Sequence, residues 1–133
     1  MSQENVEIVR GGYEAFNRRD TDTWIDGFHG EVEVHDLPTI PDAPVYRSHG
    51  DLRKWVETMF EVWTEDSYYE PVELMPEGDF VIATVRAHGW GRGSGVPIEL
   101  TFFQVFEFDA GKVRRAWAYF EKNEALEAAG LRE

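Results

Sequence analysis

The sequence contains no cysteine, which excludes disulfide bonds, thiolate catalysis and cysteine-bound zinc. It also lacks any apolar run near the length of a membrane-spanning helix, and its first residues, MSQENVEI, lack the apolar centre of a secretion signal. We therefore expect a cytoplasmic protein. The four histidines are scattered without a pair at i, i+4, so we expect no metal site.

Basic residues are scarce relative to acidic ones, with 13 Lys and Arg against 26 Asp and Glu, a net charge of −13. This charge repels phosphate groups, so neither nucleic acid nor an anionic membrane is an expected partner. A length of 133 residues indicates one domain, 1–133, because two cores would not fit in it. Five Trp, nine Phe and five Tyr give ample apolar area for that single core.

The stretch from residue 98 to residue 123 predicts two long strands joined by a turn at Asp109-Ala110-Gly111, where glycine supplies a positive φ. One apolar row of the first strand reads Ile98, Leu100, Phe102, Phe106 and Phe108. A single amide, Gln104, interrupts that row, and the matching row of the second strand is Ala116, Ala118 and Phe120. A sheet face with large aromatic residues on one strand and alanines on the next leaves a hollow beside the alanines. A hollow with one polar amide in its wall is typical of a small-molecule pocket. The alternative is a solid core in which helices fill that space.

Helical spacing dominates the first half of the chain. Residues 3–19 carry an apolar stripe of Val6, Val9, Tyr13 and Phe16. A short second helix, capped by Asp20 or Asp22, is expected to carry Trp24, Ile25 and Phe28. A third begins at Ser48 and Asp51, which resemble a capping box, and continues with Leu52, Trp55, Val56, Met59, Phe60 and Trp63. Near the end, Asn123 is expected to cap a short helix that stops at Gly130.

Strands dominate the second half. Alternation predicts strands over residues 31–36, 68–75 and 80–90, followed by the hairpin already described. The intervening stretch 37–47 holds three prolines, and its length suits a flap over a pocket. Helices early and an antiparallel meander late predict an α+β fold.

Four runs carry a family resemblance: AFNRRD, VEVHDLP, YRSHGDLRKWVETMF and FEFDAGKV. With them, essentially the whole chain resembles the SnoaL-like branch of the nuclear-transport-factor-2-like superfamily. The resemblance implies a cone, a curved antiparallel sheet wrapped around three helices, with a pocket at its open end and frequent dimers through the sheet. That superfamily includes ketosteroid isomerases, polyketide cyclases, dehydratases, an epoxide hydrolase and members without catalysis. The fold alone therefore does not supply the activity.

The isomerase pattern implies roles for two residues. Its strand end Val-Glu-Asp-Pro resembles the run 34–37, which places the general base at Asp36. Its protonated oxyanion-hole aspartate falls on Gln104, and its first-helix tyrosine falls on Gly12, adjacent to Tyr13. The base position is thus retained and the oxyanion pair is not. This argues against steroid isomerisation by the same mechanism, because a neutral carboxylic acid is a far stronger donor than an amide. The epoxide hydrolase's water-activating aspartate falls on Ala118, which argues against that reaction.

Each candidate has a structural alternative. Asp36 either faces the pocket, where burial would make its carboxylate a stronger base, or caps the loop before the prolines. Three aromatic candidates either border the pocket or simply fill the core: Tyr13, Trp24 and Trp55. Arg86 and His88 share a strand face with Ile82, and that face either lines the pocket or turns outward to a dimer mate.

Two functional hypotheses of different class follow. The first is a cofactor-independent acid–base enzyme acting on an apolar, carbonyl-containing small molecule, with Asp36 as the base and Gln104 as the group that polarises the carbonyl. Walls for this ligand would include Phe102, Ala118 and Phe120. The second is a non-catalytic module that binds an apolar ligand or dimerises. We also expect a homodimer through the outer sheet face, because Trp117 and Tyr119 would otherwise expose an apolar patch.

Overall fold

The computed structural model describes residues 2–38 and 44–130, and within these ranges the chain forms four helices and six strands. The helices are α1 (Ser2–Asn17), α2 (Thr21–Asp26), α3 (His49–Val62) and α4 (Lys122–Ala128). The strands are β1 (Phe28–His35), β2 (Val45–Tyr46), β3 (Tyr68–Glu77), β4 (Phe80–Trp90), β5 (Pro97–Asp109) and β6 (Lys112–Tyr119). The expected flap falls in part on residues 39–43, which lie outside the described residues, and its described end contains β2.

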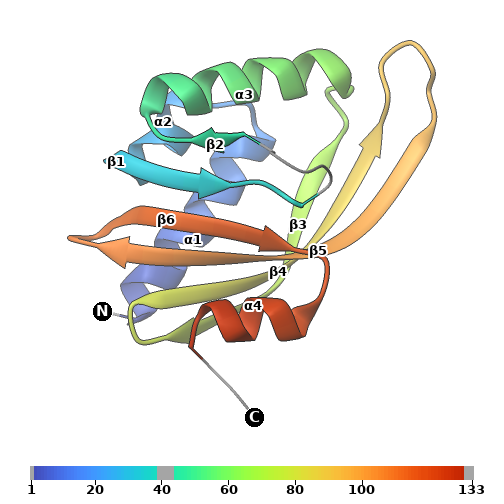
Figure 1. Cartoon of the computed structure of the whole chain (residues 1–133). Coiled ribbons are helices and arrows are strands. Elements are labelled where there is room, and N and C mark those ends of the chain that lie inside the picture. Colours follow the sequence, from blue (N-terminus) through green and yellow to red (C-terminus); the bar gives the residue numbers. More distant parts are fainter. Residues whose placement is uncertain (1, 39–43, 131–133) are drawn as a thin grey trace.

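The strands form one curved, open sheet in the order β2-β1-β6-β5-β4-β3. Neighbouring strands run antiparallel except β1 and β6, which are parallel, a detail that the sequence did not predict. Helices α1 and α3 lie against one face of the sheet, and α4 lies on the other (Figure 1). This arrangement confirms the expected α+β cone, with a sheet wrapped around helices from the first half of the chain.

Strand alternation determines which side chains face the helices. On β5, Phe102, Phe106 and Phe108 are buried in a core shared with α1. Ile98 and Leu100 belong to the same row but are 45% and 36% exposed, because β5 continues past the helices toward the tip of the β4–β5 hairpin (Figure 1). The expected inward row is therefore confirmed, and its outer end is left open to line a cavity.

Capping bonds fix where two helices begin. The Asp20 side chain caps α2 by accepting from the Thr23 N–H at 3.3 Å. Ser48 Oγ caps α3 by accepting from the Asp51 N–H at 3.0 Å, as expected. The Asp51 carboxylate accepts from the N–H of Arg47 at 2.9 Å, one residue earlier than in a standard capping box.

Two expectations about helix ends are wrong. Helix α4 begins at Lys122 after an extended Glu121 that makes no side-chain cap, so Asn123 lies inside the helix and does not cap it. Phe28 begins β1 rather than continuing α2, because the helix ends at Asp26, Gly27 is its C-cap, and Phe28 pairs with Val113 of β6.

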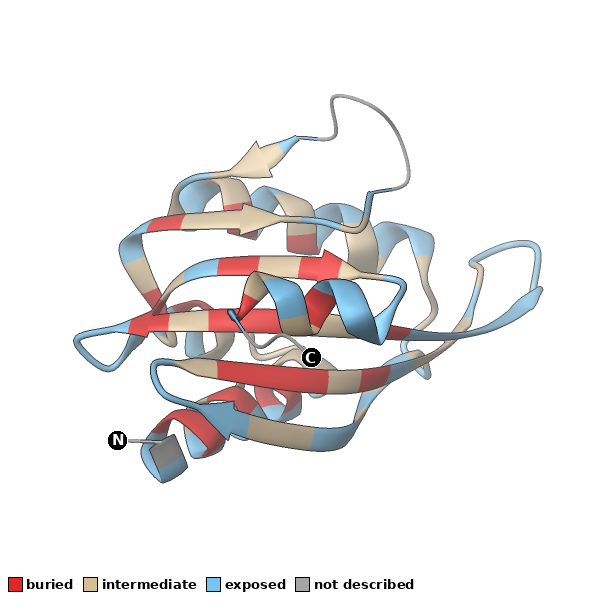
Figure 2. Cartoon of the chain, turned by 60° about the horizontal axis from the view of Figure 1, so that its bottom comes forward, coloured by how far each residue is buried: buried red, intermediate tan, exposed pale blue. Residues whose placement is uncertain are grey.

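The outer face of the sheet is partly covered by the chain's own last helix. Ala125 and Ala129 pack on Ile82 and Val105, and the side chain of Trp117 is half-buried beside them. Figure 2 shows α4 across the middle of this face, where the buried residues of β4, β5 and β6 gather. The apolar patch behind the expected homodimer is therefore smaller than the sequence indicated, and the dimer stays a prediction. None of the described helices is both long and apolar enough to cross a membrane.

Candidate functional site

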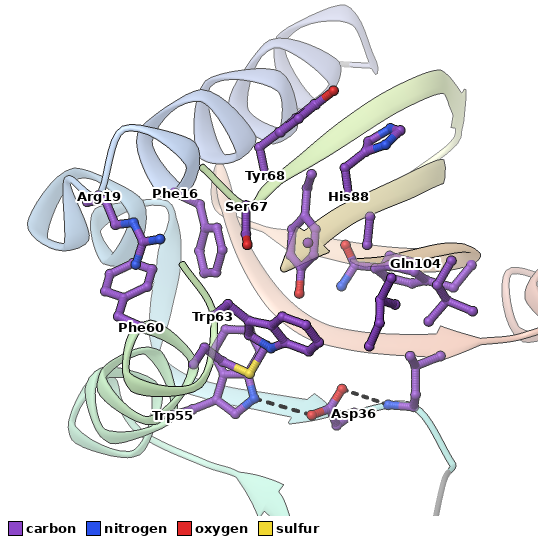
Figure 3. A pocket seen from close by; sticks show the side chains of 18 residues that line it. Phe16, Arg19, Asp36, Trp55, Phe60, Trp63, Ser67, Tyr68, His88 and Gln104 are labelled. Carbon is purple, nitrogen blue, oxygen red and sulfur yellow. Dashed lines mark hydrogen bonds between the residues drawn. The ribbon is translucent and has the colours of Figure 1, made fainter. Parts of the chain in front are cut away.

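A cavity of about 360 Å³ opens between the end of α1, the residues just after β1 and the C-terminal half of α3. The start of β3, the end of β4 and the first half of β5 complete its wall. Its walls are mainly apolar and aromatic (Figure 3). The lining residues are Phe16, Arg19, Asp36, Leu37, Trp55, Met59, Phe60, Trp63, Ser67, Tyr68, Tyr69, Ala87, His88, Gly89, Ile98, Leu100, Phe102 and Gln104. We call this space the main cavity. Its volume suits a drug-sized molecule.

Gln104 carries the amide in the wall of the main cavity, and a hydrogen bond from the core side fixes the orientation of this amide. The Tyr13 hydroxyl, carried by α1, donates a hydrogen bond to Gln104 Oε1. Gln104 Nε2 has no hydrogen-bond partner among the described residues. The carbonyl end of the amide is therefore occupied, and its N–H donors are available to the cavity.

Tyr13 lies behind the main cavity, at a smaller one of about 80 Å³. The two cavities share four wall residues, namely Phe16, Trp55, Tyr69 and Gln104, and the smaller one is also lined by Tyr13 and Trp24. Desolvation by burial, together with the nearby Tyr69 hydroxyl, raises the pKa of Tyr13 well above its ordinary value. Tyr13 is thus a neutral donor over the whole physiological range, as its bond to Gln104 requires.

Phe16 is the centre of the aromatic wall. Its ring stacks on Tyr69 at a centroid distance of 5.1 Å and contacts Trp24, Trp55 and Phe60 at 5.5–5.8 Å. Such offset and edge contacts hold the rings in a fixed arrangement. The wall is therefore a pre-formed apolar surface against which a flat ligand can lie.

The position of Tyr69 is fixed through Asn17, at the end of α1. Asn17 donates from Nδ2 to the Tyr69 carbonyl and accepts at Oδ1 from the Tyr69 N–H, both at 2.8 Å. Desolvation, with a smaller contribution from the Asp36 carboxylate, raises the pKa of Tyr69. Tyr69 was not among the residues predicted to line a pocket, although strand alternation places it on the face opposite to Tyr68 and Glu70, which are exposed.

Asp36 lies at the edge of the main cavity, just after β1, and it is exposed. Its Oδ1 accepts from the Leu37 N–H at 2.8 Å, and its Oδ2 accepts from Trp55 Nε1 at 3.3 Å (Figure 3). The carboxylate is not buried, as the first of the two alternatives would require, because Asp36 is open to solvent. Its two bonds nevertheless combine both alternatives: Asp36 caps the start of the loop and also borders the cavity.

Three of the expected ligand-binding residues do not line either cavity. Arg86 is exposed on the outer face, because its strand face is that of Ile82 and not that of buried Val85. Ala118 is buried in the core opposite Gln104, and Phe120 lies beyond the end of β6 with 38% of its area exposed. The hollow expected beside the alanines is therefore not found next to Ala118, which is packed in the core.

His88 borders the cavity, but its imidazole is engaged elsewhere. Nε2 lies 2.9 Å from Glu70 and Nδ1 lies 3.1 Å from Glu99, on the two neighbouring strands. The ring also stacks on Tyr68. The sequence-predicted residues that line the main cavity are Asp36, Trp55, His88, Phe102 and Gln104.

The described residues contain no group of three His, Asp or Glu side chains that could hold a metal ion. Cofactor-independent chemistry stays a prediction. The polar groups that the main cavity offers for it include Asp36 and Gln104.

A comparison with protein families gives the identity of the fold. The family model described as a SnoaL-like domain matches residues 9–116. The chain belongs to the SnoaL-like domain family. The matched range runs from α1 into β6, so this SnoaL-like domain has Tyr13, Asp36 and Gln104 inside its family region. The resemblance inferred from the sequence is confirmed.

Solved structures show the same fold. The SnoaL-like domain is 25% identical to an NTF2-like protein from Burkholderia thailandensis E264, with a TM-score of 0.77 and 95% of each chain covered. It is 22% identical to an NTF2-like protein from Burkholderia xenovorans LB400, with a TM-score of 0.76, covering 96% of this chain and 97% of that one. It is 20% identical to TerC, crystallised with polyporic acid, with a TM-score of 0.76 and coverage of 93% and 96%. No curated protein matches the sequence.

Proposed function

We propose that the main cavity binds a flat aromatic molecule that carries a carbonyl oxygen. The observation that carries this proposal is the orientation of Gln104, whose Oε1 accepts from Tyr13 and whose Nε2 is free among the described residues. An oriented N–H donor in an apolar wall favours a ligand with an oxygen at the same point. The structural neighbour TerC, which was crystallised with polyporic acid, supports small-molecule binding by this fold.

The aromatic wall supplies most of the binding free energy in this proposal. Phe16, Trp55 and Tyr69 line the cavity, and burial of a ligand ring against them removes apolar area from water at about 25 cal/mol per Å². The Gln104 hydrogen bond adds about 0.5–1.5 kcal/mol, roughly a factor of 2–10 in affinity. Gln104 thus selects among ligands whose binding the wall already permits.

The binding proposal is tested with anthrone and 9,10-dihydroanthracene, two similar three-ring molecules of which only anthrone carries a carbonyl. Quenching of the tryptophan fluorescence reports binding, because Trp55 and Trp63 line the cavity. Wild-type protein is expected to prefer anthrone by about 2–10-fold. In Gln104→Leu both molecules should bind alike. Absence of binding by either molecule, or an unchanged preference in Gln104→Leu, would contradict the proposal.

We infer, as a second function, that Asp36 exchanges a proton with such a ligand. The specific observation is its placement: the carboxylate borders the same cavity as Gln104 and is held by Trp55 Nε1 and the Leu37 N–H. In the step, the carboxylate takes a proton from a carbon conjugated with the carbonyl. The C–H electron pair moves to the carbonyl oxygen, and Gln104 Nε2 stabilises the resulting enolate.

Deuterium exchange at the methylene carbon of anthrone in D₂O measures this step. We expect wild-type protein to accelerate the exchange, and Asp36→Asn to lose about 10²-fold of that acceleration while it still quenches with anthrone. Asp22→Asn is the matched control, because Asp22 is an exposed carboxylate paired with Arg53 outside the cavity. Equal exchange rates in Asp36→Asn and wild type would leave the protein as a binding module.

A further inference from the structure

Arg19 has a backbone conformation that normally favours glycine. Its φ is 64°, and it shares a positive φ with only one other non-glycine among the described residues, Ala110. It ends α1 in a Schellman arrangement, in which the Asp20 N–H donates to Ala15 O at 2.8 Å and the Arg19 N–H donates to Phe16 O at 3.1 Å. An arginine in this conformation carries a steric cost, which indicates that its side chain has a use.

The Arg19 side chain lies in the wall of the main cavity. Its Cζ stands 4.1 Å from the centre of the Phe60 ring, and its Nη2 donates to the Thr64 carbonyl at 2.7 Å. Figure 3 shows the guanidinium on the opposite side of the cavity from Gln104. Nε and Nη1 have no hydrogen-bond partner within the described ranges, so part of the guanidinium fork is free.

The charge of Arg19 is also not neutralised by direct contact. No carboxylate of the described residues forms an ion pair with Arg19, although Glu65 lies near enough to stabilise its charge. Desolvation and the neighbouring Arg92 guanidinium lower the pKa of Arg19, and Glu65 opposes that effect. A chain with a net charge of −13 thus places a half-buried cation, without an ion-pair partner among the described residues, in the wall of an apolar cavity.

We propose that Arg19 binds a carboxylate group of the ligand, at the end of the main cavity away from Gln104. The inference rests on the proposed function, because it assigns the ligand as an aromatic carbonyl compound that is also an acid. The free edge of the guanidinium matches the two oxygens of a carboxylate, and Phe60 holds its plane in place. Without a fixed cation, the negative net charge would disfavour such a ligand.

The experiment compares anthraquinone-2-carboxylate with its neutral isostere, anthraquinone-2-carboxamide, by quenching of tryptophan fluorescence. Wild-type protein is expected to bind the carboxylate about tenfold or more tightly than the carboxamide. The preference should weaken as salt concentration rises, because the guanidinium is only partly buried.

Arg19→Gly is the decisive variant, because it removes the guanidinium and at the same time relieves the backbone strain. We expect it to melt at an equal or higher temperature than wild type and to bind both ligands alike. Arg10→Gln is the matched control: it removes one exposed positive charge that pairs with Glu7 on the surface of α1. This control should keep the carboxylate preference.

The outcomes separate this inference from the proposed function. If wild-type protein binds both ligands equally, or if Arg19→Gly keeps the preference, the Arg19 assignment is wrong and the apolar cavity still stands. If neither ligand binds, both the proposed function and the carboxylate assignment are contradicted. If Arg10→Gln loses the preference as Arg19→Gly does, the effect comes from net charge and the assignment is also wrong.

Discussion

The hydroxyl of Tyr13 donates to Gln104 Oε1, so a residue of the first helix determines which end of an amide on the fifth strand faces the cavity. A glutamine amide has an acceptor at one end and two donors at the other, so the hydrogen bond made by one end decides which end is left for the cavity. Because the buried hydroxyl donates to Oε1, Nε2 is the end of the amide that faces the cavity. The chemistry of the site is therefore shared between a residue at the cavity and one behind it.

Tyr13→Phe should loosen this orientation. The free energy of unfolding should fall by about 1–3 kcal/mol, because the variant leaves Gln104 Oε1 without its buried donor. The preference for anthrone over 9,10-dihydroanthracene should fall as well, since the amide can then present its oxygen. Urea unfolding and fluorescence titration measure the two effects. A full anthrone preference in Tyr13→Phe would show that the hydroxyl does not orient Gln104.

Stability should decrease at high pH through the same residue. Burial raises the pKa of Tyr13, so above its ordinary pKa of 10.0 the unfolded chain loses this proton while the folded chain keeps it. The contribution of Tyr13 is thus complete below pH 10 and is lost as the pH rises further, at about 1.4 kcal/mol per pH unit. Urea unfolding at a series of pH values should give a shallower decline in Tyr13→Phe. An identical slope in the two proteins would count against the burial of this hydroxyl.

Leu52 should contribute more to stability than the larger aromatic Phe60 on the same helix. Leu52 is 1% exposed, whereas Phe60 is partly exposed and lines the main cavity. Leu52→Ala should cost about 2–5 kcal/mol, the range for a buried leucine. Phe60→Ala should cost less and should enlarge the cavity. Urea unfolding of the two variants measures both losses, and a larger loss in Phe60→Ala than in Leu52→Ala would contradict this order.

Gly89 should be required for the shape of the cavity. A Cβ at this position would lie 3.1 Å from Trp63 Cε3 and 3.4 Å from Ser67 Oγ, so Gly89→Ala must displace the indole. Because Trp63 lines the cavity, anthrone affinity should fall several-fold. Gly30→Ala is the control, since a Cβ at that strand position meets nothing within 4 Å and should leave binding unchanged. Equal anthrone affinity in both variants would mean that Trp63 adapts freely.

Much of the fold follows from the sequence because strand alternation is a local signal. The strand Phe80–Trp90 has the predicted bounds, and the inward row of β5 is as predicted. The parallel pairing of β1 with β6 was not predicted, because it joins segments about 80 residues apart and no local pattern encodes it. Asn123 was wrongly predicted to cap α4, because the sequence does not distinguish an asparagine that precedes a helix from one that lies within its first turn.

The site was less predictable than the fold. Asp36 and Gln104 were found through resemblance and through an interrupted apolar row, and both border the main cavity. The position of Arg86 stayed open, because parity along β4 fixes which residues share a face but not which part of that face borders the cavity. Arg19 was missed because its role depends on a positive φ at the end of α1, and nothing in the sequence distinguishes it from Arg18. Side-chain roles set by tertiary contacts are not encoded locally.

The most direct test of the central claim observes the side-chain amide of Gln104 by ¹⁵N NMR. The resonance pair is assigned by its loss in Gln104→Leu. Titration with anthrone should shift this pair strongly, since a ligand carbonyl would accept from Nε2, and 9,10-dihydroanthracene at equal occupancy should shift it far less. An amide signal that responds equally to the two molecules, or to neither while they bind, would contradict the account.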